Sequence, residues 1–385
     1  MSIARKLTPP NHSFFLFGPR GTGKSTWLRE HLSHALWKNL LLSEHYLQLN
    51  SDPSLLRKEV EALSAGSWVV IDEVQRIPAL LNEVHDLIAR FGNRYKFAMS
   101  GSSARKLKRL DVNLLAGRAI ERKMFPLVFS ELSSEWGLEK VLAYGSLPSV
   151  VSNSQYSKDI LSTYVSTYLQ QEIQQEALVE DISSFHRFLK ILAIMNGEQL
   201  NASSVARDSG VARTTVDRYL DILVDTLIAV RIPGWQPRAK VKEQSAPRYY
   251  LFDCGVCRAI TGRVYGAFSD LEAGKLLETY ILHELRAAIS YMNLGGELSY
   301  WRSASKQEID FVWTRGDCAI GFEIKASSTW RREYGSAIRD LMGKRKLHSG
   351  YVVYTGESLT NEQGVSALSV SRFLQKLWNG EILVE

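Results

Sequence analysis

The chain has 385 residues, enough for two or three domains that each bury a core of their own. Its composition, 45% hydrophobic and 23% charged, is ordinary for a globular protein, and three cysteines argue against a disulfide framework. The net charge of +6 permits nucleic acid as a partner without requiring it. We find neither a signal-peptide core nor an apolar run of about 18 residues, so we expect a cytoplasmic protein with no membrane span.

A short apolar strand at residues 14–17 leads into a phosphate-binding loop and then a helix, which is the context that a P-loop needs. Glycines let such a loop turn tightly and aim its N–H groups at phosphate oxygens, while the helix N-terminus adds positive charge. We expect Lys24 to reach the β- and γ-phosphates of ATP and Ser25 to hold Mg²⁺. The residues predicted to bind the nucleotide are Gly18, Pro19, Arg20, Gly21, Thr22, Gly23, Lys24, Ser25 and Thr26.

A second strand of the expected parallel sheet ends in two acidic residues. Residues 68–71 are a continuous apolar run followed by Asp72 and Glu73, about 50 residues after the P-loop lysine. This is a Walker B arrangement, in which Asp72 is a ligand of Mg²⁺ and Glu73 orients and polarises the attacking water. Between these two strands in the chain, residues 45–50 are expected to form another strand.

Two further residues are candidates for the ATPase site. Ser100 follows the apolar residues 95–99, so it either senses the γ-phosphate or water beside the Walker B strand, or simply caps a helix. Arg118 precedes a strand at 119–124 and is the candidate for an arginine finger offered to a neighbouring subunit, with Arg122 as the fallback. Such a finger would require a homo-oligomer.

A basic stretch and a helical pair are the candidate nucleic-acid contacts. Residues 94–123 carry nine Lys and Arg, which form either a solvated face or a surface for phosphate. Residues 201–208, a short turn at Gly210 and residues 213–220 follow the helix-turn-helix pattern, which serves DNA or protein contact. The linker after it is basic and aromatic-flanked, or else only a solvated loop, and includes Trp235, Arg238, Lys240, Lys242 and Arg248.

A third group of residues lies in the C-terminal third. Glu323 and Lys325 are two apart on one strand and therefore share a face, and Asp310 stands on the preceding strand. With Glu278 from an amphipathic helix, this order is that of a PD-(D/E)xK nuclease. Asp310 and Glu323 would hold Mg²⁺ or Mn²⁺, and Lys325 would orient the attacking water. Glu308 could substitute for Asp310, although strand alternation favours its being exposed.

A C-x-x-C pair at Cys254 and Cys257 lacks the second ligand pair of a zinc site, so we expect both to be ordinary small residues.

The motifs together resemble a family of prokaryotic AAA-type ATPases whose C-terminal domain has a restriction-endonuclease-like fold. The resemblance covers nearly the whole chain and implies architecture more than purpose, because the role of that family is unassigned. Besides the P-loop and the C-terminal group, it is carried by residues 69–78, 99–102, 115–118, 125–131 and 249–255.

We therefore expect an α/β protein with four parts. These are an AAA-type ATPase domain (1–130), a helical lid or connector (131–180), a winged helix with its basic linker (181–248) and a nuclease-like α/β domain (249–385). The expected function is ATP hydrolysis coupled to the binding of nucleic acid, with DNA favoured, and to metal-dependent phosphodiester cleavage. The alternative is an ATP-switched binding protein or scaffold whose nuclease fold is silent.

Overall fold

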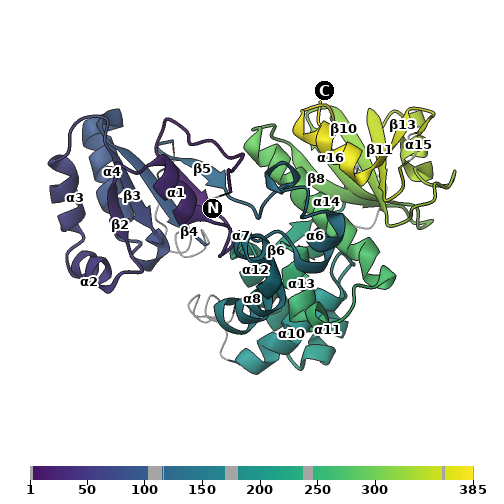
Figure 1. The fold of residues 1–385 in the computed structure, drawn as a ribbon, viewed down its shortest axis with the longest axis horizontal. Helices are drawn as coiled ribbons and strands as arrows, with labels where there is room; N and C mark the ends of the chain where they lie inside the picture. Colours follow the sequence, from purple (N-terminus) through teal and green to yellow (C-terminus); the bar gives the residue numbers. More distant parts are fainter. Residues whose placement is uncertain are drawn as a thin grey trace. The chain divides into compact units, whose positions relative to one another are not determined.

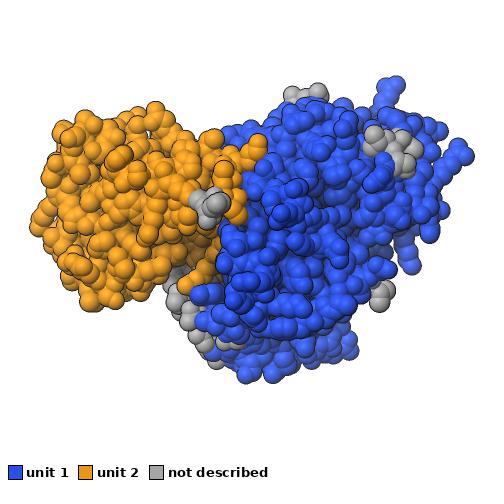
Figure 2. All heavy atoms as spheres, in the orientation of Figure 1, with its two compact units in different colours: residues 1, 127–224, 229–385 blue, residues 2–126, 225–228 orange. Residues whose placement is uncertain are grey.

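The computed structural model describes residues 3–102, 115, 117–169, 181–236, 246–357 and 360–384 (Figure 1). The chain divides into two compact units, shown in different colours in Figure 2. The N-terminal unit comprises residues 2–126 and 225–228, and the C-terminal unit comprises residues 127–224 and 229–385. Both mix helices with sheets, which confirms the predicted α/β class. Across the described ranges, no helix is long and apolar enough to cross a membrane.

The N-terminal unit is built on one sheet of five strands in the order β2-β3-β4-β1-β5. Every neighbouring pair in it is parallel, so the carboxyl ends of all five strands meet at one edge. The strand β4 lies between β1 and β3, and this places the end of the P-loop strand near the end of the Walker B strand. The strands are β1 (Phe14–Phe17), β2 (Leu36–Asn39), β3 (Trp68–Asp72), β4 (Lys96–Gly101) and β5 (Ile120–Lys123).

Helices cover both faces of this sheet, which explains why its inner strands β1, β3 and β4 are largely apolar and buried on both sides. On one face Phe14 of β1 packs edge-on against Trp27 of α1 (Lys24–His31), with ring centroids 6.2 Å apart. On the other face, side chains such as Phe97 pack against α2, α3 and α4. These helices span Ser43–Ser51, Ser54–Glu61 and Leu80–Phe91, and short 3₁₀ turns occupy Val74–Arg76 (η1) and Gly92–Arg94 (η2).

The expected strand at residues 45–50 is wrong, because these residues lie inside α2. The second strand in the chain is β2, immediately after α1. The apolar residues Tyr46 and Leu49 pack onto the core at a spacing of three, which fits a helix as well as a short strand.

The C-terminal unit begins with a helical part. A two-stranded antiparallel sheet, β6 (Ala229–Ile232) with β7 (Arg248–Leu251), follows the helices α10 to α12. The helices are α6 (Leu138–Tyr144), α7 (Pro148–Ser152), α8 (Ser157–Thr163), α10 (Ile182–Ile194), α11 (Ala202–Ser209), α12 (Arg213–Asp225) and α13 (Cys254–Ile260). Shorter turns lie at Phe129–Glu131 (η3), Ser154–Tyr156 (η4), Tyr164–Leu169 (η5) and Arg263–Tyr265 (η6).

The remainder of this unit is a mixed six-stranded sheet with the order β12-β13-β11-β10-β9-β8. Strands β8, β9 and β10 are antiparallel neighbours, whereas β10, β11 and β13 run parallel. Its elements are α14 (Asp270–Tyr291), β8 (Glu297–Arg302), β9 (Glu308–Arg315), β10 (Cys318–Lys325), α15 (Ser336–Gly343), β11 (Ser349–Tyr354), β12 (Thr360–Glu362), β13 (Val365–Ser369) and α16 (Val370–Trp378).

Helices pack on opposite faces of this sheet. Phe373 of α16 packs edge-on against Phe322 of β10 and Tyr351 of β11, with ring centroids 5.9 and 6.3 Å apart. Ile338 of α15 belongs to a separate core cluster that includes Val312 and Val352. The mixed sheet is therefore covered on both sides, and its strand ends are the places where polar side chains can reach a ligand.

Two buried carboxylates join distant segments of the C-terminal unit. Asp253 caps α13 by accepting from the Val256 N–H at 3.0 Å and also accepts from the Ser146 N–H at 2.8 Å. Glu284 of α14 accepts from the Phe129 N–H at 2.7 Å and from Nε1 of Trp378 at 2.6 Å. Burial raises the pKa of Glu284 to about 8, because it disfavours the ionised form of the carboxyl group. The Phe129 N–H and Nε1 of Trp378 therefore contact a carboxyl group that favours its protonated form.

Candidate functional site

The predicted P-loop closes around its own lysine. Gly21 and Gly23 have φ angles of 83° and 90°, in the left-handed region that favours glycine. Lys24 is only 5% exposed, and its Nζ donates to the carbonyl oxygens of Gly18 and Pro19 at 2.7 and 3.1 Å. A Cβ at Gly18 would lie 2.2 Å from the carbonyl oxygen of Met124, so the loop needs glycine there as well.

The helix α1 starts at Lys24, with Gly23 as its N-cap and no side chain capping it. The N-terminal N–H groups of such a helix point toward the loop, where an anion can accept them. Ser25 and Thr26 occupy the first turn of this helix. The loop, the lysine and the helix N-terminus thus have the arrangement that binds phosphate in P-loop proteins.

The Walker B residues lie at the end of β3, where β3 pairs with β4. Asp72 is 1% exposed, and its carboxylate accepts a short hydrogen bond from Oγ of Ser100. The backbone N–H of Glu73 donates to the same Oγ at 3.3 Å. Ser100 lies within β4 and not at a helix N-terminus. From there it contacts both acidic residues. Its contacts favour the role beside the Walker B strand over that of a helix cap.

Arg118 lies against its own unit in this structure. One of its guanidinium nitrogens makes a short contact with Nε2 of His85 on α4, while Arg122 donates to the Glu121 carbonyl oxygen at 3.1 Å. Part of the predicted basic stretch, residues 103–114 and 116, falls outside the described residues. That Arg118 acts as an arginine finger on the nucleotide of a neighbouring subunit stays a prediction.

The C-terminal unit brings the four residues of the third group into one neighbourhood. Glu323 and Lys325 share a face of β10, with Oε1 and Nζ 3.1 Å apart. The Ile324 N–H donates to Oδ2 of Asp310 at 2.8 Å, which ties β9 to β10 where the two strands separate. Glu278 of α14 accepts from the hydroxyl of Tyr250 at 3.0 Å.

The pKa values of these groups are shifted by burial and by one another's charge. Burial, followed by the charge of Asp310, raises the pKa of Glu278 to about 8. Burial likewise raises the pKa of Asp310 to about 6, although the Lys325 ammonium and the Ile324 N–H oppose the rise. Burial acts to lower the pKa of Lys325, but Asp310 and Glu323 outweigh it and the pKa is raised. Titratable groups with shifted pKa values lie close together in many functional sites, and they also do so in structural ion networks.

The expected second metal site is not supported by the geometry. Over the part of the chain that the structure describes, no group of three or more His, Cys, Asp or Glu side chains is arranged to hold a metal ion. Protein donors engage Glu323 on both sides: Oε2 accepts from the Gly335 N–H at 2.9 Å, and Oε1 lies 3.1 Å from Nζ of Lys325.

Arg248, which the sequence predicts to lie in a basic linker, is a member of this site. It starts β7, is buried and makes a short ion pair with Glu308. Its guanidinium lies over the ring of Tyr300, 4.3 Å from the centroid. Glu308 is consequently paired and partly buried rather than simply exposed. The apolar run at 249–252 was the signal that Arg248 begins a strand.

Among the other predicted linker residues, the backbone N–H of Trp235 donates to the carbonyl oxygen of Tyr300 in β8 at 2.6 Å. Trp235 therefore lies beside β8. Arg238, Lys240 and Lys242 lie outside the described residues.

The helical pair has the predicted order of helix, turn and helix. Gly210 ends α11 with a φ of 71°, and α12 starts three residues later. Val205 of α11 and Val216 of α12 are buried, whereas Arg213 and Arg218 are exposed on α12. Cations on an exposed helix face suit phosphate contacts, but they are also what any solvated helix presents.

Cys254 and Cys257 are buried, and burial raises the pKa of the Cys257 thiol to about 12. Both therefore stay protonated and serve as small core residues rather than as ligands.

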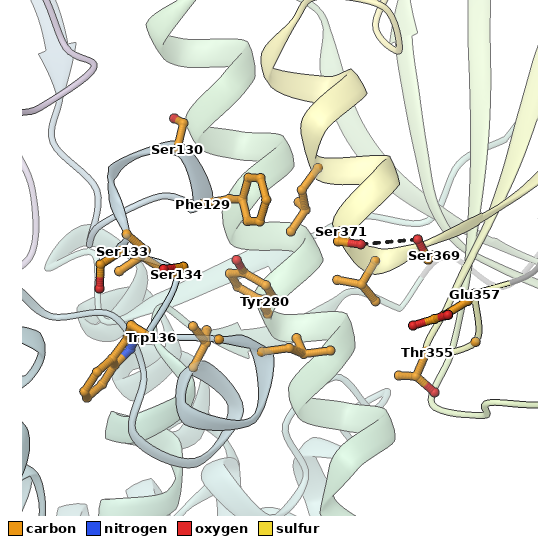
Figure 3. Close-up of a pocket in the computed structure, with 17 residues that line it drawn as sticks. Phe129, Ser130, Ser133, Ser134, Trp136, Tyr280, Thr355, Glu357, Ser369 and Ser371 are labelled. Carbon is orange, nitrogen blue, oxygen red and sulfur yellow. Dashed lines mark hydrogen bonds between the residues drawn. The ribbon is translucent and has the colours of Figure 1, made fainter.

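The C-terminal unit also contains a pocket of about 570 Å³ that no motif predicted (Figure 3). Phe129, Trp136 and Tyr280 form aromatic parts of its wall, and Ser369 and Ser371 at the start of α16 add hydroxyl groups. None of the predicted site residues lines it.

Comparison with protein families divides the chain into three matched segments. Residues 10–133 match the family described as "AAA domain". Residues 10–133 therefore form an AAA-type P-loop domain. Residues 135–264 and 273–373 match two families described as "Domain of unknown function", DUF8612 and DUF4143, so the predicted nuclease-like domain is not confirmed by these matches.

Two known proteins that are similar over most of the chain have names that state no function. "Uncharacterized protein Rv2008c" of Mycobacterium tuberculosis is 28% identical over 348 residues, 89% of this chain and 76% of that protein. An "Uncharacterized protein" of Haemophilus influenzae is 24% identical over 341 residues, 80% of this chain and 82% of that protein.

Among solved structures, a variant of Thermotoga maritima RuvB aligns with a TM-score of 0.31 and 18% identity over 58% of this chain and 82% of its own. The Aeropyrum pernix ORC1 protein in complex with DNA aligns with a TM-score of 0.30 and 14% identity over 66% of this chain and 87% of its own. Likenesses of this size do not establish a shared function.

The raised pKa of Glu278 predicts how the stability of the C-terminal unit depends on pH. Its folded-state pKa is about 8 against an ordinary value of 4.5, so folding favours the protonated form. The stability associated with that proton is complete below about pH 4.5 and is lost as the pH rises through about 8. Glu278→Gln removes this loss. We expect the free energy of unfolding of the wild type to fall relative to the variant by up to about 1.4 kcal/mol per pH unit in that window.

Urea unfolding of both proteins across this pH range measures the difference. The matched control is Glu297→Gln, which changes an exposed carboxylate on β8 and should parallel the wild type. Parallel curves for wild type and Glu278→Gln would show that Glu278 is ionised in the folded protein at neutral pH.

Proposed function

We propose that this protein binds and hydrolyses ATP at the AAA domain. The observation that carries the proposal is the meeting of the P-loop and the Asp72–Glu73 pair at one edge of a parallel sheet. The ammonium of Lys24, now hydrogen-bonded to loop carbonyl oxygens, is the cation for the nucleotide phosphates. The match of residues 10–133 to the AAA domain family supports the same function.

The residues present at this site fit Mg²⁺. Ser25 stands at the first turn of α1, and the Asp72 carboxylate is held at the end of β3 by Ser100. Ser25 and Asp72 would hold the ion, which when bound neutralises charge on the phosphates. Glu73 orients the attacking water and accepts its proton. The Ser100 hydroxyl keeps Asp72 and the backbone of Glu73 in a fixed relation to each other.

We further propose that ATP hydrolysis is coupled to nucleic-acid binding, with DNA favoured. The winged helix predicted at 181–248 would supply the contact through the exposed Arg213 and Arg218 of α12, the helix that precedes the β6–β7 pair in the chain. The positive net charge of the chain supports a polyanionic partner. If Arg118 leaves His85 and reaches the nucleotide bound by a neighbouring subunit, the active form is a homo-oligomer.

Phosphodiester cleavage at the C-terminal site is a second candidate function. Its support is the convergence of Glu278, Asp310, Glu323 and Lys325 on one place. The opposing observation is that protein donors already engage these carboxylates, which favours the alternative of an ATP-switched regulator with a silent nuclease fold. Activity therefore has to be measured with and without a divalent ion.

For the ATP site, we expect Lys24→Ala to weaken ATP binding at least about 100-fold, because it removes the main cation facing the phosphates. Titration of a fluorescent ATP analogue in Mg²⁺ measures this. The control Lys96→Ala removes a surface lysine of the same unit, which donates to Asn11, and should bind as the wild type does. Unchanged affinity in a Lys24→Ala protein with an unaltered unfolding midpoint would contradict the assignment of the P-loop.

For the second candidate, we expect Asp310→Ala to abolish cleavage of labelled nucleic acid while leaving ATP hydrolysis unaltered, because the two sites lie in different units. The assay covers single-stranded, duplex and branched substrates in Mg²⁺, Mn²⁺ or EDTA. If the wild type cleaves none of them, the cleavage function is rejected. Binding that weakens steeply with salt would then support the regulator that binds nucleic acid.

A further inference from the structure

Gln75 is a buried polar residue of the AAA domain to which the proposed mechanism gives no role. It lies in η1, two residues after Glu73, and is 7% exposed. Its Nε2 donates to Oε2 of Glu73 at 2.5 Å and to Oγ of Ser102 at 3.1 Å. The amide thus connects the carboxylate after β3 to the residue that follows β4.

The amide of Gln75 can take only one orientation here. Its Nε2 hydrogens are both used, whereas its Oε1 is buried and has no hydrogen-bond partner among the described residues. Rotation of the amide by 180° would place Oε1 against the Glu73 carboxylate, and two acceptors would then face each other.

Glu73 itself is held from two directions. Its φ is 63°, a left-handed conformation that is uncommon for a residue with a Cβ and is often found at functional sites. The backbone N–H is held by Ser100, and one carboxylate oxygen is held by Gln75. The conformation of Glu73 is therefore defined by the ends of β3 and β4 together.

Gly101 provides the room that this arrangement needs. A Cβ at Gly101 would lie 2.6 Å from Oε1 of Gln75, closer than real contacts allow. Any side chain at Gly101 would push the amide away from its present position.

We propose that Gln75 is a positioning residue for Glu73: its amide fixes one carboxylate oxygen and thereby sets the direction of the other, which accepts the proton of the attacking water. This inference rests on the proposed ATP hydrolysis and adds a residue to its machinery. A held carboxylate presents its proton-accepting oxygen in one place, and misplacement by about 1 Å can reduce a rate about 100-fold. In this role Gln75 acts through Glu73, the residue that its amide contacts.

The test compares Gln75→Ala with the wild type in steady-state ATP hydrolysis and in equilibrium ATP binding. We expect kcat to fall at least about tenfold, with the Kd for ATP unchanged within about twofold, because only the orientation of Glu73 is altered. The matched control is Gln48→Ala, which removes an exposed amide from α2 of the same unit and should alter neither quantity.

A double-mutant cycle separates positioning from a merely structural role. In a Glu73→Gln background, Gln75→Ala should cause no further loss of rate, since the group that it positions is already gone. Additive losses, an unchanged kcat or a faster kcat in Gln75→Ala would each overturn the inference.

The two proposals fail differently. A wild-type protein that binds ATP without hydrolysing it rejects the ATPase function and the role of Gln75 together. If the wild type is active, Glu73→Gln is inactive and Gln75→Ala has the wild-type rate, only the role of Gln75 is rejected.

Discussion

The parallel pairing of β4 with both β1 and β3 is the constraint on which the ATPase site depends. It places the P-loop and the Asp72–Glu73 pair at the same edge of the sheet, although they are distant in the chain. Ser100 then joins the strands through side-chain contacts, because its hydroxyl reaches both Asp72 and the backbone of Glu73. The apolar strands beneath are buried on both faces, so these polar groups rest on a rigid support.

The C-terminal unit uses a related device in a different sheet. Where β9 and β10 separate, backbone N–H groups and Lys325 engage the carboxylates of Asp310 and Glu323. Burial would otherwise make ionised carboxylates costly, and the raised pKa values of Glu278 and Asp310 express that cost. The contacts that stabilise the site engage Oδ2 of Asp310 and both oxygens of Glu323.

The sequence predicted the structure correctly where one short stretch determines both the local fold and the functional side chains. The P-loop, the Walker B strand and the helix-turn-helix order could all be predicted, because glycine positions and apolar runs determine them locally. Residues 45–50 were assigned wrongly, since a short apolar pattern fits helix and strand alike. Arg248 was missed as a site residue because its partner Glu308 is distant in the chain and only tertiary structure brings the two together. Gln75 was missed although Glu73 is only two residues away, because no local pattern shows that its amide contacts both that carboxylate and Ser102.

The most direct measurement of the central claim is ATP turnover by Glu73→Gln compared with its ATP binding. The substitution keeps the size and hydrogen-bonding reach of the side chain and removes its ability to accept a proton at neutral pH. The account predicts ATP affinity within about twofold of the wild type and a rate lower by at least about 100-fold, a typical contribution of a general base. Hydrolysis at the wild-type rate would contradict it, and the proton of the attacking water would then go to another group.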